Sequence, residues 1–208
     1  MPASALRSEP ATLRRALAGL LLAALLLPVA ANAAEGAGLR EQIRENLVSP
    51  TSQRLVGVQW DDEPAVIALY FGASWCGPCH AFTPELKQIR SALRDAGADT
   101  EVVYVSLDES EQDMRRYMRS QEMPWPAINY RRLRSLPAIR ALGGVAPPNL
   151  VLIDAQGNVL ASGWDGRRYL GLKPVVTRWL EVVKAAQDDA GRRASGTALP
   201  CLVTPATR

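Results

Sequence analysis

The sequence predicts an α/β sandwich of three layers, with a mixed central sheet and helices on both faces. Two continuous apolar runs, Val66 to Phe71 and Val102 to Leu107, have the length and composition of strands that are covered on both sides. A segment of helical periodicity follows each run, and a strand hairpin and an amphipathic helix close the pattern. Strands buried on both sides require helices above and below the sheet.

The first half of the chain supplies a short helix and two strand–helix units. Leu39 to Leu47 is expected to be helical and to stop at Ser49-Pro50. Apolar residues recur at helical spacing from Pro78 to about Asp95, and Pro84 is expected to bend this helix. Ser110 to Arg119 predicts a second long helix, because charged neighbours lie four residues apart.

The second half supplies a loop, a hairpin and two helices. Met123 to Pro126 is expected to be a loop, because two prolines one residue apart break helix and strand. Leu133 to Leu142 predicts a short helix that ends at two glycines. Leu150 to Ile153 and Val159 to Ser162 predict a hairpin with turn residues between them, and Val175 to Ala186 predicts the closing helix.

Composition and charge narrow the class of protein. The 208 residues are 48% hydrophobic and 22% charged, which is typical of a globular chain and excludes a collagenous, coiled-coil or wholly disordered one. Outside residues 1–34, 21 basic side chains stand against 20 acidic ones. Nothing in this balance points to nucleic acid or an anionic membrane as a partner.

Residues 1–34 are typical of a secretory signal peptide. Arg14 and Arg15 precede an apolar run from Ala16 to Leu27, and Ala31-Asn32-Ala33 offers a small-residue cleavage site. A membrane anchor is the rival interpretation, but the run is shorter than the ~20 residues that a spanning helix needs. We therefore expect cleavage near Ala33 or Ala34, a periplasmic protein, and no stable membrane span after cleavage.

The candidate site is Trp75-Cys76-Gly77-Pro78-Cys79, at the junction of a buried strand and a helix. Cysteines three residues apart share a helix face, so their sulfurs can bond. Cys76 lies at the helix N-terminus, where free N–H groups and the helix dipole stabilise a thiolate, which makes it the expected nucleophile. Cys79 would then resolve the mixed disulfide, and this chemistry needs neither a cofactor nor a metal.

The two cysteines also allow three other interpretations: a structural disulfide, a zinc site and a haem attachment site. A purely structural disulfide would close a loop too short to add much stability. A zinc site lacks further ligands at suitable spacing, since only His80 and Cys201 remain. Cys76 to His80 also satisfies the C-x-x-C-H pattern of covalent haem attachment, with a methionine as second axial ligand (Met114, Met118 or Met123). The strand–helix context favours the redox pair.

These residues resemble the thioredoxin superfamily and, within it, the tryparedoxin and nucleoredoxin branch. The similarity rests on Tyr70 to Cys79, on Val102 to Pro124-Trp125, and on Pro148 to Asp154. It implies a thioredoxin-like fold, thiol–disulfide exchange, supporting roles for Trp75, Gly77 and Pro78, and a cis peptide bond before Pro148.

Three features depart from the family pattern. Tyr70 stands where many thioredoxins carry a buried carboxylate that moves a proton. Pro147 stands where the family pairs its backbone with an extended substrate, and a proline has no N–H to donate. Cys201 lies outside the pattern, and either forms an exchangeable or intermolecular bridge or is incidental.

The sequence as a whole predicts an exported thiol–disulfide oxidoreductase that reduces protein disulfides. Its partners would be client proteins with disulfides or thiols and an upstream electron donor or acceptor. Trp125 is expected either beside the dithiol, as a docking residue together with Pro147, or in the core. The alternatives are a non-catalytic binding module and a haem electron carrier. The expected divisions are a signal peptide (1–34), an N-terminal extension (35–62), a thioredoxin-like domain (63–187) and a disordered tail (188–208).

Overall fold

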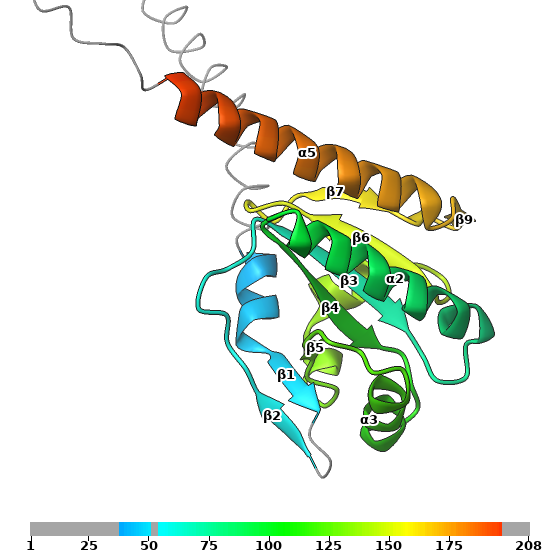
Figure 1. The fold of residues 1–208 in the computed structure, drawn as a ribbon. Coiled ribbons are helices and arrows are strands. Elements are labelled where there is room, and N and C mark those ends of the chain that lie inside the picture. Colours follow the sequence, from blue (N-terminus) through cyan, green and yellow to red (C-terminus); the bar gives the residue numbers. More distant parts are fainter. Residues whose placement is uncertain (1–37, 51–53, 197–208) are drawn as a thin grey trace, which may run out of the picture.

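The computed structural model describes residues 38–50 and 54–196 (Figure 1). A seven-stranded sheet runs through it in the order β2-β1-β5-β4-β3-β6-β7. Strands β3, β4 and β5 are parallel, and each of the other pairings is antiparallel. The strands are β1 (Leu47–Pro50), β2 (Leu55–Gly57), β3 (Val66–Gly72), β4 (Thr100–Ser106), β5 (Ala127–Ile128), β6 (Asn149–Ile153) and β7 (Val159–Ser162).

Helices cover both faces of this sheet, which confirms the predicted three-layer sandwich. The helices α2 (Gly77–Asp95), α3 (Glu111–Ser120) and α5 (Lys173–Gly196) pack on one face. A helix over residues 38–45, the 3-10 turn η1 (Leu133–Ser135) and the helix α4 (Pro137–Ala141) pack on the other.

The central strands are buried on both faces, as their continuous apolar runs predict. Within β3, Ala68 and Tyr70 point into the core under α2, whereas Leu69 and Phe71 point to the opposite core. All seven residues of β3 and all seven of β4 are buried. The two strands are therefore tightly packed on both faces, and the loops of the candidate site follow their carboxyl ends.

The segment 35–62, predicted as an N-terminal extension, instead adds two strands to the sheet and packs the helix over residues 38–45 against it. Strand β1 pairs with β5 on one side and with β2 on the other. Leu47 and Val48 are both buried, one in each core. The predicted helix stop at Ser49-Pro50 therefore lies inside a strand. An apolar stretch of two residues is too short to show a strand period.

The predicted disordered tail also needs correction. Helix α5 continues past the predicted end at Ala186 to Gly196. Two ion pairs support this extension, and each joins residues that lie one helical turn apart. Lys184 Nζ lies 2.8 Å from Asp188 Oδ2, and Arg192 pairs with Asp189. Residues 197–208, with Cys201, and the predicted signal peptide lie outside the described residues.

The predicted hairpin is confirmed, and a second hairpin follows it. The Asp154 carboxylate accepts hydrogen bonds from the backbone N–H groups of Gln156 and Asn158 at the turn between β6 and β7, where Gly157 has a φ of 83°. The second hairpin consists of β8 (Trp164–Asp165) and β9 (Arg168–Tyr169), which form a small sheet of their own. Pro137 starts α4 and divides the predicted helix 133–142 into η1 and α4.

Within the described part of the chain, none of the helices combines the length and the apolar character needed to cross a membrane.

Trp125 belongs to the core and not to a docking surface. Only 2% of its surface is exposed, and its ring meets that of Tyr70 edge-on with centroids 6.5 Å apart. The loop between two prolines turns the indole inward, because the next residues enter β5. Its indole N–H is buried and has no hydrogen-bond partner.

The Trp125→Ala variant is therefore expected to lose about 3–5 kcal/mol of unfolding free energy, because it empties a buried aromatic site. Trp125→Phe should cost less, since it keeps most of the ring and removes an unpaired buried donor. Urea unfolding followed by circular dichroism measures both. A Trp125→Ala chain that is as stable as the wild type but slow with clients would restore the docking role.

Candidate active site

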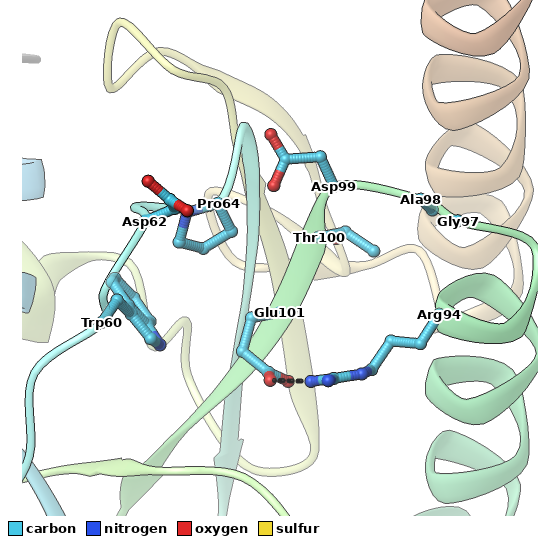
Figure 2. A pocket seen from close by; sticks show the side chains of 9 residues that line it. All are labelled: Trp60, Asp62, Pro64, Arg94, Gly97, Ala98, Asp99, Thr100 and Glu101. Carbon is cyan, nitrogen blue, oxygen red and sulfur yellow. Dashed lines mark hydrogen bonds and ion pairs between the residues drawn. The ribbon is translucent and has the colours of Figure 1, made fainter.

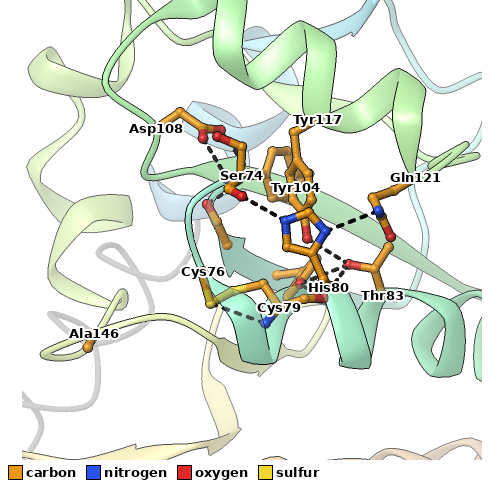
Figure 3. The surroundings of a disulfide bond; sticks show 12 residues. Ser74, Cys76, Cys79, His80, Thr83, Tyr104, Asp108, Tyr117, Gln121 and Ala146 are labelled. Atoms are coloured by element: carbon orange, nitrogen blue, oxygen red, sulfur yellow. Dashed lines mark hydrogen bonds between the residues drawn. A yellow bond between two sulfur atoms is a disulfide. The ribbon is translucent and has the colours of Figure 1, made fainter.

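Cys76 ends the turn between β3 and α2, and Cys79 lies in the first turn of α2 (Figure 3). Cys76 is the N-cap of α2, and Pro78 lies in the first turn, where its missing N–H costs no helical hydrogen bond. The backbone N–H groups of Cys79 and His80 both point to the Cys76 carbonyl oxygen, at 3.0 and 3.3 Å. Cys76 thus lies at the N-terminus of a 19-residue helix, where the N–H groups of the first turn and the helix dipole favour a negative charge.

The two sulfurs form a disulfide, and their surroundings differ. The Cys76 sulfur accepts the backbone N–H of Cys79 at 3.1 Å. Cys76 is 4% exposed and Cys79 is fully buried. Trp75, Gly77 and Pro78 are exposed around the bridge, and 59% of the Trp75 surface is open to solvent. Cys76 is therefore the less enclosed of the two cysteines, which is the arrangement that attack by Cys76 and release by Cys79 would require.

The carboxylate of Asp108 binds the backbone of the turn between β3 and α2. Its Oδ1 accepts the backbone N–H of Ser74 at 2.6 Å, and its Oδ2 accepts the Ser106 hydroxyl at 2.7 Å. The Tyr104 hydroxyl donates to the Gly72 carbonyl at 2.8 Å, next to this carboxylate. Asp108 is only 7% exposed. Sequence reasoning missed this residue, although an acid directly after the second buried strand lies at the same sheet edge as the cysteines.

Hydroxyl groups pack behind Cys79, where the family pattern has a carboxylate. The Tyr70 hydroxyl lies 3.0 Å from Thr83 Oγ1 and 3.3 Å from the Cys79 carbonyl oxygen. Thr83 donates to that same carbonyl at 2.9 Å, and the Tyr117 hydroxyl lies 3.2 Å from Thr83 Oγ1. Burial raises the pKa of Tyr70 and also that of Tyr117, so both phenols stay protonated at neutral pH.

His80 is held on both ring nitrogens. Its Nε2 lies 2.7 Å from the Ser74 carbonyl, which can only accept, so Nε2 carries the proton. Its Nδ1 accepts from the Gln121 side-chain amide at 3.3 Å, and its ring meets Tyr117 edge-on (Figure 3). Both ring nitrogens of His80 therefore have partners within the protein.

The other candidate ligands do not complete a haem or metal site either. Met114 and Met118 are buried in the core under α3, at 0% and 1% exposure, and Met123 is 8% exposed. Among the described residues, no group of three or more His, Cys, Asp or Glu side chains is placed to hold a metal ion. The side chains present fit a dithiol site and do not fit the haem alternative.

The loop before β6 faces the dithiol from another part of the chain. The Pro147–Pro148 peptide bond is cis, as the family resemblance implies. Ala146 lies in the surroundings of the disulfide (Figure 3). Pro148 is buried and Pro147 is half-buried. The indole of Trp75 is exposed beside the bridge, whereas the indole of Trp125 is buried in the core.

A hollow of about 340 Å³ lies at the opposite end of the central strands, where β4 begins (Figure 2). Its lining includes Trp60, Asp62 and the first residues of β4. Glu101 in its wall is engaged by Arg94, with Arg94 Nη1 2.9 Å from Glu101 Oε2, and by Arg90. Because β3 and β4 are parallel, this hollow is separated from the cysteines by the length of both strands. It takes no part in the dithiol site.

The buried phenol of Tyr70 leads to a dependence of stability on pH. Its raised pKa means that, above pH about 10, the unfolded chain loses this proton while the folded chain keeps it. The unfolding free energy should therefore fall as the pH rises above about 10. In Tyr70→Phe this fall should be shallower, while Thr83 still supplies the Cys79 carbonyl with a hydrogen bond. Urea unfolding between pH 8 and pH 11 tests this, and equal slopes for both proteins would contradict it.

Comparisons with known proteins agree with this geometry. Residues 64–159 match the sequence profile of a family described as thioredoxin-like. Probable nucleoredoxin 1 of Arabidopsis thaliana is 34% identical over 148 residues, which are 67% of this chain and 24% of that protein. The chain spans about a quarter of the length of the first curated relatives that it matches.

Two solved structures share the fold over most of their length. Tryparedoxin II complexed with glutathionylspermidine is 25% identical, with a TM-score of 0.51, over 62% of this chain and 87% of that one. Thioredoxin from Wuchereria bancrofti is 26% identical, with a TM-score of 0.50, over 67% of this chain and 97% of that one. The sandwich, the bridged cysteine pair and these similarities show that the chain belongs to the thioredoxin superfamily of oxidoreductases, on its nucleoredoxin- and tryparedoxin-like branch.

Proposed function

We propose that the protein is an exported thiol–disulfide oxidoreductase that reduces disulfides in client proteins. The observation that carries this proposal is the unequal placement of the two sulfurs at the start of α2. Cys76 receives an N–H and is the more accessible sulfur, while Cys79 is enclosed behind it. Such a pair suits attack by one thiol and release by the other.

The reaction runs in two exchange steps from the reduced dithiol. The Cys76 thiolate attacks one client sulfur, forms a mixed disulfide, and displaces the second client sulfur as a thiolate that takes up a proton. Cys79 then loses its proton, and its thiolate attacks the Cys76 sulfur and displaces the first client sulfur as a thiolate, which takes up the proton that Cys79 released. The client gains two electrons and two protons, and the protein is left with the Cys76–Cys79 bridge. An upstream thiol donor returns the two electrons.

The direction of electron flow is argued from the residues between the cysteines. Gly77 and Pro78 resemble the corresponding pair in reducing thioredoxins. The direction in vivo depends on the potential of the pair against that of its partners, and about 30 mV is worth about 1.4 kcal/mol for two electrons. Reduction of clients is the direction that we propose.

A trapping experiment separates this function from that of a non-catalytic binding module. In Cys79→Ser the release step is lost, so mixed disulfides through Cys76 should accumulate with natural partners. Cys76→Ser, which has the same number of cysteines, is the matched control and should trap nothing. Diagonal electrophoresis of both variants gives the comparison. Equal trapping by the two, or none by either, would contradict the assigned roles.

Export is a separate part of the proposal and has its own test. It is supported by the arginine pair, the apolar run 16–27 and the Ala31-Asn32-Ala33 site. The full chain, expressed in a Gram-negative host, should appear in the periplasm with a mass that begins after Ala33 or Ala34. Ala33→Leu should slow this cleavage, because the site needs a small residue. An uncleaved wild-type chain that stays in the cytoplasm would contradict export.

A further inference from the structure

The loop that faces Cys76 has few bonds of its own. Residues 144–148 lie between α4 and β6 and contain two prolines, which lack an N–H group. Across the described part of the chain, a single hydrogen bond reaches the backbone of these five residues. It is donated by the Trp164 indole Nε1 to the carbonyl of Ala146, at 3.1 Å. The position of Ala146 beside the dithiol therefore depends on a side chain from another element.

The indole of Trp164 also packs directly on the loop backbone. A Cβ atom at Gly144 would lie 2.3 Å from Trp164 Cδ1, so a side chain there would collide with the ring. Gly144 has a φ of +73°, which favours glycine for a second reason. The ring of Tyr169 also contacts the indole, with centroids 4.9 Å apart. The indole therefore contacts both the loop and the second strand of its own hairpin.

The hairpin that carries Trp164 is itself anchored to the main sheet. The Gly163 N–H donates to the Leu150 carbonyl at 3.1 Å and lies 3.0 Å from Asn149 Oδ1. The amide nitrogen of Asn149 donates to the Leu142 carbonyl at 2.8 Å. Asn149 is fully buried and directly follows the cis-proline. One end of the loop is therefore fixed by Asn149, and its middle by Trp164.

We propose that Trp164 is a positioning residue that holds the Ala146–Pro148 loop beside Cys76 for the docking of client proteins. The inference rests on the proposed function for its consequence in catalysis. Because Cys76 is only 4% exposed, a protein segment that reaches its sulfur must pass the residues around it, and Ala146 is one of them. A small disulfide has no such extended segment and does not need the loop in a fixed place.

The test removes the indole N–H and keeps an aromatic ring. In Trp164→Phe we expect KM for a protein disulfide to rise about fivefold, as for one lost hydrogen bond, with kcat unchanged. The rate with a small aromatic disulfide should not change. Trp60→Phe is the matched control, because Trp60 is also half-buried and lies at the opposite end of the central strands. It should leave every rate unchanged.

A second readout does not depend on activity. Backbone order parameters from nitrogen-15 relaxation should be near 0.85 for Val145 and Ala146 in the wild type and should fall toward 0.6 or below in Trp164→Phe (approximate bounds for rigid and mobile backbone). Thermal unfolding checks that the variant is folded. Unchanged order parameters together with an unchanged KM would overturn the proposal. An equal loss of rate with small and with protein disulfides would also overturn it, because the substitution would then have disturbed the dithiol itself. If the wild type reduces no protein disulfide, the proposed function fails, while the order parameters still decide whether Trp164 holds the loop.

Discussion

A buried carboxylate one strand away from the cysteines fixes the turn on which the site depends. Asp108 accepts the Ser74 N–H, and Ser74 in turn offers its carbonyl to His80 in the first turn of α2. The parallel pairing of β3 and β4 brings Asp108 to this turn, because both strands end at the same edge of the sheet. This contact links the turn that carries Cys76, directly before α2, to the loop after the neighbouring strand.

The groups around the dithiol depart from the family pattern, because hydroxyls stand at the position where many thioredoxins carry a buried carboxylate. At the position of the usual buried carboxylate, Tyr70 and Thr83 bind the Cys79 carbonyl with neutral hydroxyls. A buried carboxylate at this end of the sheet is instead that of Asp108, which accepts hydrogen bonds from a backbone N–H and from a hydroxyl. The enclosed side of the bridge is therefore lined by neutral donors, and its open side by Trp75 and the proline loop.

The central strands, the hairpin and the placement of Cys76 and Cys79 at the start of α2 could be predicted, because each follows from a local pattern. These patterns are continuous apolar runs, turn residues and a motif at a strand–helix junction. Strands β1 and β2 could not be predicted, since their apolar stretches are too short to show a period. The contacts of Asp108, Trp125 and Trp164 could not be predicted either, because these side chains contact residues that are distant in the sequence. Asp108 lies 34 residues from its partner Ser74, and no local pattern states which distant backbone group a side chain will meet. The orientation of Trp125 depends on the packing of β5 in the same way.

The proposed mechanism requires that the N-terminus of α2 makes Cys76 a thiolate at a pH where an ordinary thiol is protonated. The rate of alkylation against pH tests this in the Cys79→Ser, Cys201→Ser double variant, in which Cys76 is the one thiol left. We expect a half-maximal rate well below pH 8.5, the ordinary pKa of a cysteine. A half-maximal rate at about pH 8.5 or above would show that the helix N-terminus does not activate Cys76.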